Sequence, residues 1–185
     1  MSNNHTVQDS TKATQKLWVV GVGASAGGLE ALAEFVGSLP EDLNACIVIA
    51  QHLAPHAKSM MVELLSKKSQ WRIEAALHKQ RLEALKIFII PPNFDVEVQQ
   101  GLLLLSRAGE ETRPKPSVDR FFLSLARAYG DKAIGVILSG SGSDGAEGIQ
   151  AIKASGGVTV VQDEKTAKYH GMPGASLDTG QVDYV

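Results

Sequence analysis

The sequence has little of several features that mark specialised classes of protein. It contains one cysteine, Cys46, in 185 residues, so it has neither an internal disulfide nor the cysteine pairs of a structural zinc site. Because Cys46 lies inside the apolar run 45–50, we interpret it as a small core residue rather than a nucleophile. No apolar run approaches the roughly 20 residues that span a bilayer. Residues 1–16 are polar and lack the apolar core of a signal peptide.

An excess of charge of one sign is also missing. The chain has 18 Lys and Arg against 20 Asp and Glu, a formal net charge of -2, and no long basic run. This balance argues against a nucleic-acid partner bound through a phosphate-neutralising face. A composition of 44% hydrophobic and 21% charged residues is typical of a soluble globular protein, and the length suits one domain. We therefore expect a cytoplasmic protein with no membrane insertion.

The residues that are present predict an α/β fold with a mostly parallel sheet, because apolar strands alternate with segments of helical periodicity. Residues 1–16 are interpreted as a disordered polar leader and 17–185 as the folded domain. The expected strands are 17–22, 45–50, 133–138 and 158–161, and the expected helices are 29–36, 60–65, 118–129 and 146–154. Ser117 is the expected N-cap of the helix 118–129. Short strands at 71–75, 85–90, 94–98 and 102–105 predict a small β insertion in the middle of the chain.

Ligands of open parallel sheets bind beyond the carboxyl ends of the strands, so the residues after each strand are the most informative. After the first strand, residues 23–28 (Gly-Ala-Ser-Ala-Gly-Gly) fit the pattern G-x-S-x-G, in which glycines let a sharp turn present a serine, here Ser25. Two other interpretations remain open. The turn is either a simple helix start capped by Ser25, or a phosphate loop that lacks the ribose-binding acid expected after the next strand.

His52 directly follows the second strand, at the same predicted edge of the sheet as Ser25, where it can serve as a general base. The alternative is an ordinary polar loop histidine. A metal site with His56 is disfavoured, because Pro55 between them opposes a shared helical face and no glutamate completes an HExxH motif.

Asp144 lies in the Gly- and Ser-rich segment 139–146 after the strand 133–138, where it can orient an imidazole. Helix-starting loops often contain aspartate, and a phosphate loop is a second alternative that lacks the Walker lysine. Each signal is weak alone. Ser25, His52 and Asp144 after three strands of one sheet together favour a Ser-His-Asp arrangement, in a chain order that differs from that of α/β-hydrolases.

These residues resemble a known family. Residues 23–28, 51–52 (Gln-His), 139–146 (Ser-Gly-Ser-Gly-Ser-Asp-Gly-Ala), 162–164 (Gln-Asp-Glu) and 171–173 (Gly-Met-Pro) are similar, in order, to the catalytic domain of CheB-type protein-glutamate methylesterases. The resemblance implies a doubly wound parallel sheet with a β-hairpin insertion. It also implies hydrolysis of glutamyl methyl esters on chemoreceptors, deamidation of receptor glutamines as a second activity, and no metal or organic cofactor.

Carried over by position, the resemblance makes Ser25 the nucleophile, His52 the general base and Asp144 the residue that orients it. It places Ala26 and Ser141 in the oxyanion region. Ala26 stands where stand-alone members usually carry Thr, and Ser141 where they usually carry Met. The alanine at 26 and the serine at 141 resemble those of methylesterase domains that are fused to a CheR-type methyltransferase and sensor modules. Because only 16 polar residues precede residue 17, we expect no receiver domain in this chain. We also expect a domain that belongs to a longer protein, with a methylated helical region of a receptor as its partner.

Overall fold

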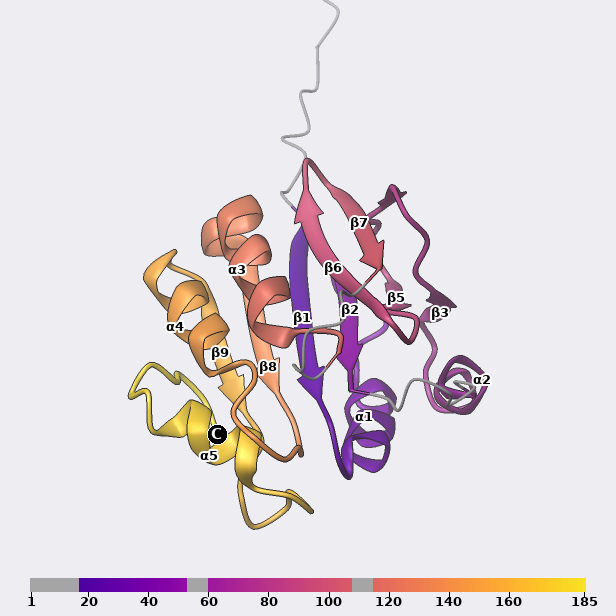
Figure 1. Cartoon of the computed structure of the whole chain (residues 1–185). Coiled ribbons are helices and arrows are strands. Elements are labelled where there is room, and N and C mark those ends of the chain that lie inside the picture. Colours follow the sequence, from indigo (N-terminus) through magenta and orange to yellow (C-terminus); the bar gives the residue numbers. More distant parts are fainter. Residues whose placement is uncertain (1–16, 53–59, 108–114) are drawn as a thin grey trace, which may run out of the picture.

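The computed structural model describes residues 17–52, 60–107 and 115–185. Its centre is a six-stranded sheet in which every paired strand is parallel, in the order β3-β5-β2-β1-β8-β9 (Figure 1). The strands are β1 (Trp18–Ala24), β2 (Ala45–Gln51), β3 (Arg72–Ala75), β5 (Lys86–Ile89), β8 (Ala133–Ile137) and β9 (Val158–Val161). β1 and β2 are buried along almost their whole length, as expected for strands covered on both faces.

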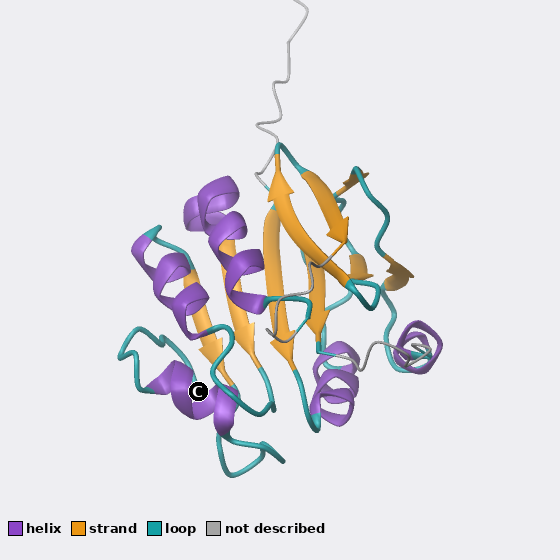
Figure 2. Ribbon diagram, viewed as in Figure 1, coloured by secondary structure: helices purple, strands orange, loops and turns teal. Residues whose placement is uncertain are grey.

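Helices cover both faces of this sheet, as a doubly wound fold requires (Figure 2). The helices are α1 (Gly28–Gly37), α2 (Met61–Ser66), α3 (Val118–Tyr129), α4 (Ala146–Ala154) and α5 (Gly171–Leu177), with a 3₁₀ turn at Gly130–Lys132. α1 and α2 pack on one face through Leu32 and Leu65. α3 and α4 pack on the other through Phe122 and Ile149. Within the described ranges, no helix is long and apolar enough to cross a membrane.

A second, three-stranded antiparallel sheet packs on the same face as α3. It contains β4 (Gln80–Arg81), β6 (Phe94–Gln99) and β7 (Leu102–Arg107) in the order β4-β7-β6. The predicted insertion therefore exists but is smaller than expected. The segments 71–75 and 85–90, which we assigned to it, form β3 and β5 of the main sheet, because period-two patterning identifies a strand without identifying its neighbour.

The start of α3 follows its local sequence. The Ser117 hydroxyl accepts a hydrogen bond from the backbone N–H of Arg120 at 3.3 Å and caps α3, as predicted. Cys46 is fully buried in β2, and burial raises the pKa of its thiol to about 12, which agrees with its assignment to the core. The expected leader, residues 1–16, lies outside the described residues.

Candidate active site

Ser25 and His52 lie next to each other at the carboxyl ends of two paired strands. β1 ends at Ala24 and β2 at Gln51, and these two residues are partners in the parallel ladder. The backbone N–H of His52 donates to the carbonyl of Ala24 at 3.0 Å. Because neighbouring strands are about 5 Å apart, Ser25 and His52 leave the sheet side by side.

The His52 ring forms a hydrogen bond with Asp144, which comes from the loop between β8 and α4. Nε2 of His52 and Oδ2 of Asp144 are 2.9 Å apart, and the two side chains are only 10% and 12% exposed. A carboxylate can only accept, so Nε2 carries the proton and Nδ1 is the ring nitrogen left to accept one. β8 pairs with β1 on the side opposite β2, where the strand order reverses, so the bond passes over the topological switch point of the sheet.

Asp144 is held in place by the start of α3. Its Oδ2 accepts from the backbone N–H of Val118 at 2.8 Å, and its Oδ1 accepts from that of Asp119 at 2.9 Å. Burial by itself raises the pKa of Asp144, but the hydrogen bonds from the His52 ring and from these two N–H groups outweigh burial and lower it. Asp144 is therefore a fixed anion at neutral pH.

Asp119 is a site residue that the sequence interpretation missed. Its Oδ1 accepts from the backbone N–H groups of Gly145 at 2.9 Å and Gly148 at 2.8 Å, at the start of α4. Burial, followed by the charge of Asp144 and a hydrogen bond to its side chain, raises the pKa of Asp119 to about 6, despite the lowering effect of the two N–H donors. The available sequence signal was an acid in the first turn of a helix capped by Ser117.

The turn that carries Ser25 is fastened by a second serine, Ser139, which is 1% exposed. The backbone N–H of Ser25 donates to the carbonyl of Ser139 at 3.0 Å. The Ser139 hydroxyl donates to the carbonyl of Ala26 at 2.8 Å and accepts from the backbone N–H of Tyr169 at 3.0 Å. Gly27 closes the turn with a φ of 71°, the left-handed region that glycine adopts at no steric cost.

The Ala26 N–H belongs to the same peptide group as the Ser25 carbonyl, which is fixed by two hydrogen bonds. The carbonyl of Ser25 accepts from the backbone N–H of Gly28 at 2.9 Å and from Nε2 of Gln51 at 2.7 Å. Because C=O and N–H of a trans peptide point in opposite directions, the Ala26 N–H points away from Gln51. It has no acceptor among the residues that the structure describes.

The Ser141 N–H has the same arrangement. The carbonyl of Gly140, on the same peptide, accepts from the backbone N–H of Met172 at 2.9 Å, so the Ser141 N–H points away from α5. No acceptor for it occurs in the described ranges. A Cβ built at Gly140 would lie 3.0 Å from the Cβ of Ser25, so this loop lies directly against Ser25.

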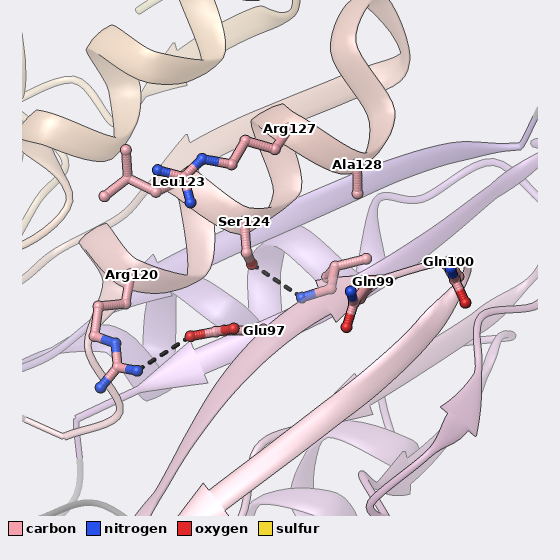
Figure 3. Close-up of a pocket in the computed structure, with 9 residues that line it drawn as sticks. Glu97, Gln99, Gln100, Arg120, Leu123, Ser124, Arg127 and Ala128 are labelled. Carbon is pink, nitrogen blue, oxygen red and sulfur yellow. Dashed lines mark hydrogen bonds and ion pairs between the residues drawn. The ribbon is translucent and has the colours of Figure 1, made fainter.

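Two surface pockets lie along α3 beyond Asp144, and neither is lined by Ser25 or His52. One, of about 500 Å³, is lined by Asp144, Asp119, Glu147 and neighbouring residues. The other, of about 430 Å³, lies between α3 and β6 and includes Glu97, Gln99 and Arg127 (Figure 3). The two pockets share Arg120 and Leu123, and Arg120 donates to Glu97 at 3.1 Å across the second one. We call them together the α3 groove.

The remaining motif residues support the same loops. Gln162 accepts from the backbone N–H of Ser139 through Oε1 at 2.8 Å, and Met172 is fully buried beside Gly140. Gln51 is buried with its amide on the Ser25 carbonyl, so its position offers nothing to a ribose and the phosphate-loop alternative loses support. His56 lies outside the described residues.

Comparison with known proteins gives the same family as the sequence motifs. A family profile described as CheB methylesterase matches residues 20–185. The chain belongs to the CheB methylesterase family. A protein-glutamate methylesterase/protein-glutamine glutaminase of Anaeromyxobacter dehalogenans is 39% identical over 167 residues, which cover 90% of this chain and 49% of that protein. A Leptospira interrogans protein whose name carries the same two activities is 34% identical over 165 residues, 89% of this chain and 86% of its own length.

A solved structure is also similar to this one. The crystal structure of the Thermotoga maritima CheB methylesterase catalytic domain matches with a TM-score of 0.86 and 29% identity, and the match covers 92% of each chain. The fold predicted from the sequence is thereby confirmed. The described pairing of strands and helices is that of a CheB-type catalytic domain.

Proposed function

We propose that the protein is a serine hydrolase that removes methyl esters from glutamyl side chains of a chemoreceptor-like protein. The observation that carries this proposal is the hydrogen bond between His52 and Asp144 beside the turn of Ser25. Membership of the CheB methylesterase family supports the ester as substrate. The names of the relatives support a second activity, hydrolysis of the glutamine amide at the same site.

In the proposed mechanism, Ser25 Oγ attacks the ester carbonyl while Nδ1 of His52 takes its proton. In the usual triad the aspartate binds Nδ1 and the serine uses Nε2, so the two nitrogens exchange roles here. The exchange follows from the hydrogen bond between Nε2 and Asp144. The negative charge of Asp144 stabilises the imidazolium that forms.

Collapse of the tetrahedral intermediate breaks the bond to the methoxy oxygen. The imidazolium of His52 returns the proton to that oxygen, methanol leaves, and a glutamyl ester of Ser25 remains. Water then attacks this ester as His52 takes a proton from it. The bond to Ser25 Oγ breaks, His52 returns the proton to that oxygen, and the product is a free glutamate side chain. With a glutamine substrate, ammonia takes the place of methanol in the same sequence.

The backbone N–H groups of Ala26 and Ser141 are the proposed oxyanion donors. Both point away from carbonyls that are already hydrogen-bonded, and both flank Ser25. The side chains at 26 and 141 differ from those usual in stand-alone members, but backbone donors do not depend on side-chain identity. Removing one such donor typically costs about 10²–10³ in rate.

We propose the α3 groove as the seat of the substrate segment that carries the ester. It begins at Asp144 and continues between α3 and β6, which suits the approach of a helix or extended chain. A cytoplasmic location follows from a receptor's cytoplasmic region as substrate. Fusion to a methyltransferase and sensor modules stays a prediction.

The deciding experiment compares wild type with Ser25→Ala on a methylated receptor fragment and measures methanol release. Loss of release with an unchanged circular dichroism spectrum is expected. Unchanged methanol release by Ser25→Ala would show that Ser25 is not the nucleophile. An alternative is a regulatory module with little turnover, and a fluorophosphonate that fails to label Ser25 of the folded protein would favour it.

A further inference from the structure

Gln51 uses a buried amide to join the backbones of the two proposed reacting residues. It is 5% exposed, and its Nε2 donates to the carbonyl of Ser25 at 2.7 Å and to that of His52 at 3.3 Å. Both acceptors are carbonyl oxygens, which fixes the orientation of the amide: the NH₂ group faces them and Oε1 faces away.

The other end of this amide is left without a partner. Oε1 of Gln51 is buried and makes no hydrogen bond within the described part of the chain. A Cβ at Gly28 would lie 2.4 Å from this oxygen, so the first residue of α1 leaves room for it only because it is glycine. A buried polar atom without a partner destabilises a fold, so the position of Gln51 calls for an explanation.

The task follows from the geometry of one peptide. Of the two hydrogen bonds to the Ser25 carbonyl, the one from Gln51 Nε2 is the shorter. The Ala26 N–H is on the opposite side of the same planar peptide. Any rotation of this peptide moves the N–H away from the proposed oxyanion. The Gly28 N–H, the second donor to the carbonyl, belongs to the same turn as Ser25, whereas Gln51 ties the carbonyl to the end of β2.

We infer that Gln51 is a positioning residue that aims the Ala26 N–H at the developing oxyanion, at a cost in stability from its unpartnered Oε1. The inference rests on the proposed function only for the identity of the substrate. The same N–H would stabilise the oxygen of any acyl or phosphonyl group that adds to Ser25.

The test uses Gln51→Met in the full chain. Methionine has a similar length and flexibility but no donor and no unpartnered oxygen, so it removes both features together. We expect kcat for methyl ester hydrolysis to fall about tenfold or more with KM changed less than twofold, while the melting temperature stays the same or rises. A purely structural role for Gln51 predicts the reverse pattern, a lower melting temperature and an unchanged kcat.

A second variant, Gln51→Asn, keeps a buried amide but is one methylene shorter, so it cannot reach the Ser25 carbonyl. We expect it to lose activity by a similar factor while losing stability. The inference would be overturned if kcat fell only in the variant with the lower melting temperature. It predicts that kcat falls in both variants, because both lose the hydrogen bond to the Ser25 carbonyl. Ser176→Ala is the matched control. Among the described residues, Ser176 Oγ is the other buried side-chain nitrogen or oxygen without a hydrogen-bond partner. This variant should change the melting temperature and leave kcat as in wild type.

The rate of labelling by a fluorophosphonate separates this inference from the proposed function. In that reaction Ser25 Oγ bonds to phosphorus, fluoride leaves and the serine proton passes to His52, with the phosphonyl oxygen in the place of the oxyanion. If the wild type is labelled but releases no methanol from a methylated receptor fragment, the substrate assignment fails. The ratio of labelling rates for wild type and Gln51→Met still decides the role of Gln51, and a ratio near one overturns it.

Discussion

Asp119 and Asp144 each accept hydrogen bonds from the helix that the other one introduces. Asp144 precedes α4 and binds the backbone N–H groups of Val118 and Asp119 at the start of α3. Asp119 lies in the first turn of α3 and binds the N–H groups at the start of α4. Each helix end thereby receives an anion at its positive pole, and Asp144 is fixed for its contact with His52.

These hydrogen bonds place the carboxyl groups of Asp119 and Asp144 close together. The first prediction uses Asp119→Asn to test the raised pKa of Asp119. The pKa of Asp119 is raised from 3.8 to about 6, so between pH 4 and pH 6 the native state binds more protons than the unfolded state. Stability from this residue is therefore present at low pH and is lost as pH rises through 6. Asparagine keeps the acceptor oxygen without the charge. We expect the stability of wild type relative to the variant to fall by about 1–3 kcal/mol between pH 4 and pH 7.

Urea denaturation of both proteins across this pH range measures the difference directly. Asp131→Asn is the control, because the Asp131 side chain is 68% exposed, and its stability difference from wild type should not change with pH in this way. A difference between wild type and Asp119→Asn that is the same at pH 4 and pH 7 would contradict the raised pKa.

Ser139 gives a second prediction, because its buried hydroxyl is hydrogen-bonded to two backbone groups. Ser139→Ala leaves the carbonyl of Ala26 and the N–H of Tyr169 without this partner. We expect a loss of about 1–3 kcal/mol in unfolding free energy and a lower kcat, since the turn that carries Ser25 loosens. Ser139→Thr keeps the hydroxyl and should recover most of both.

Thr159→Val is the matched control for Ser139. The Thr159 hydroxyl is also buried and serves two backbone groups, donating to Gln181 O at 2.7 Å and accepting from Asp183 N at 3.0 Å. It lies on β9, away from the Ser25 turn. A similar stability loss with unchanged kcat is expected. If both variants lose kcat in proportion to stability, the special role of Ser139 is refuted.

The third prediction concerns Arg127 in the α3 groove. Arg127 makes no ion pair with another described residue, whereas Arg120 is paired with Glu97 and Asp95. Ester hydrolysis turns neutral side chains into carboxylates, so a partly demethylated substrate carries negative charge. Arg127→Glu should raise KM for a receptor fragment about three- to tenfold, more at low salt, because exposed charges act mainly on encounter.

Hydrolysis of p-nitrophenyl acetate provides the internal control for Arg127, since so small an ester does not reach along the groove. Its kcat/KM should be the same in wild type and Arg127→Glu. An equal loss on both substrates would mean that the substitution disturbs α3 itself, and the groove would no longer be supported as the substrate seat.

Local patterns were enough to place most of the fold. The bounds of α4 and β9 agree with the expectation to the residue, and the cap at Ser117 was recognised from its position before an amphipathic stripe. α5 was missed, because its glycines and Pro173 give it little helix propensity and the burial of Met172 supports it. Similarly, the sheet to which β3 and β5 belong depends on pairing with β2 and not on their own residues.

The same distinction holds at the site. Ser25, His52 and Asp144 were predicted because each follows a strand, a position that can be recognised in the sequence. The roles of Gln51, Asp119 and Ser139 depend on hydrogen bonds between segments far apart in the chain. Ala26 and Ser141 were named from the family resemblance alone. The orientation of their N–H groups depends on the hydrogen bonds made by the carbonyls of Ser25 and Gly140, which no local sequence pattern predicts.

The position of β1 between β2 and β8 also has a consequence for how the protein acquires its activity during folding. β1 and β2 are close in the sequence, whereas β8 joins β1 only after most of the chain has been made. A nascent chain or fragment that ends before residue 133 contains Ser25 and His52 but lacks both Asp144 and the loop that holds the Ser25 turn. Closing so long a loop is slow. Recovery of activity on refolding should therefore report a late tertiary step of the fold, and chains that end before residue 133 should have no esterase activity.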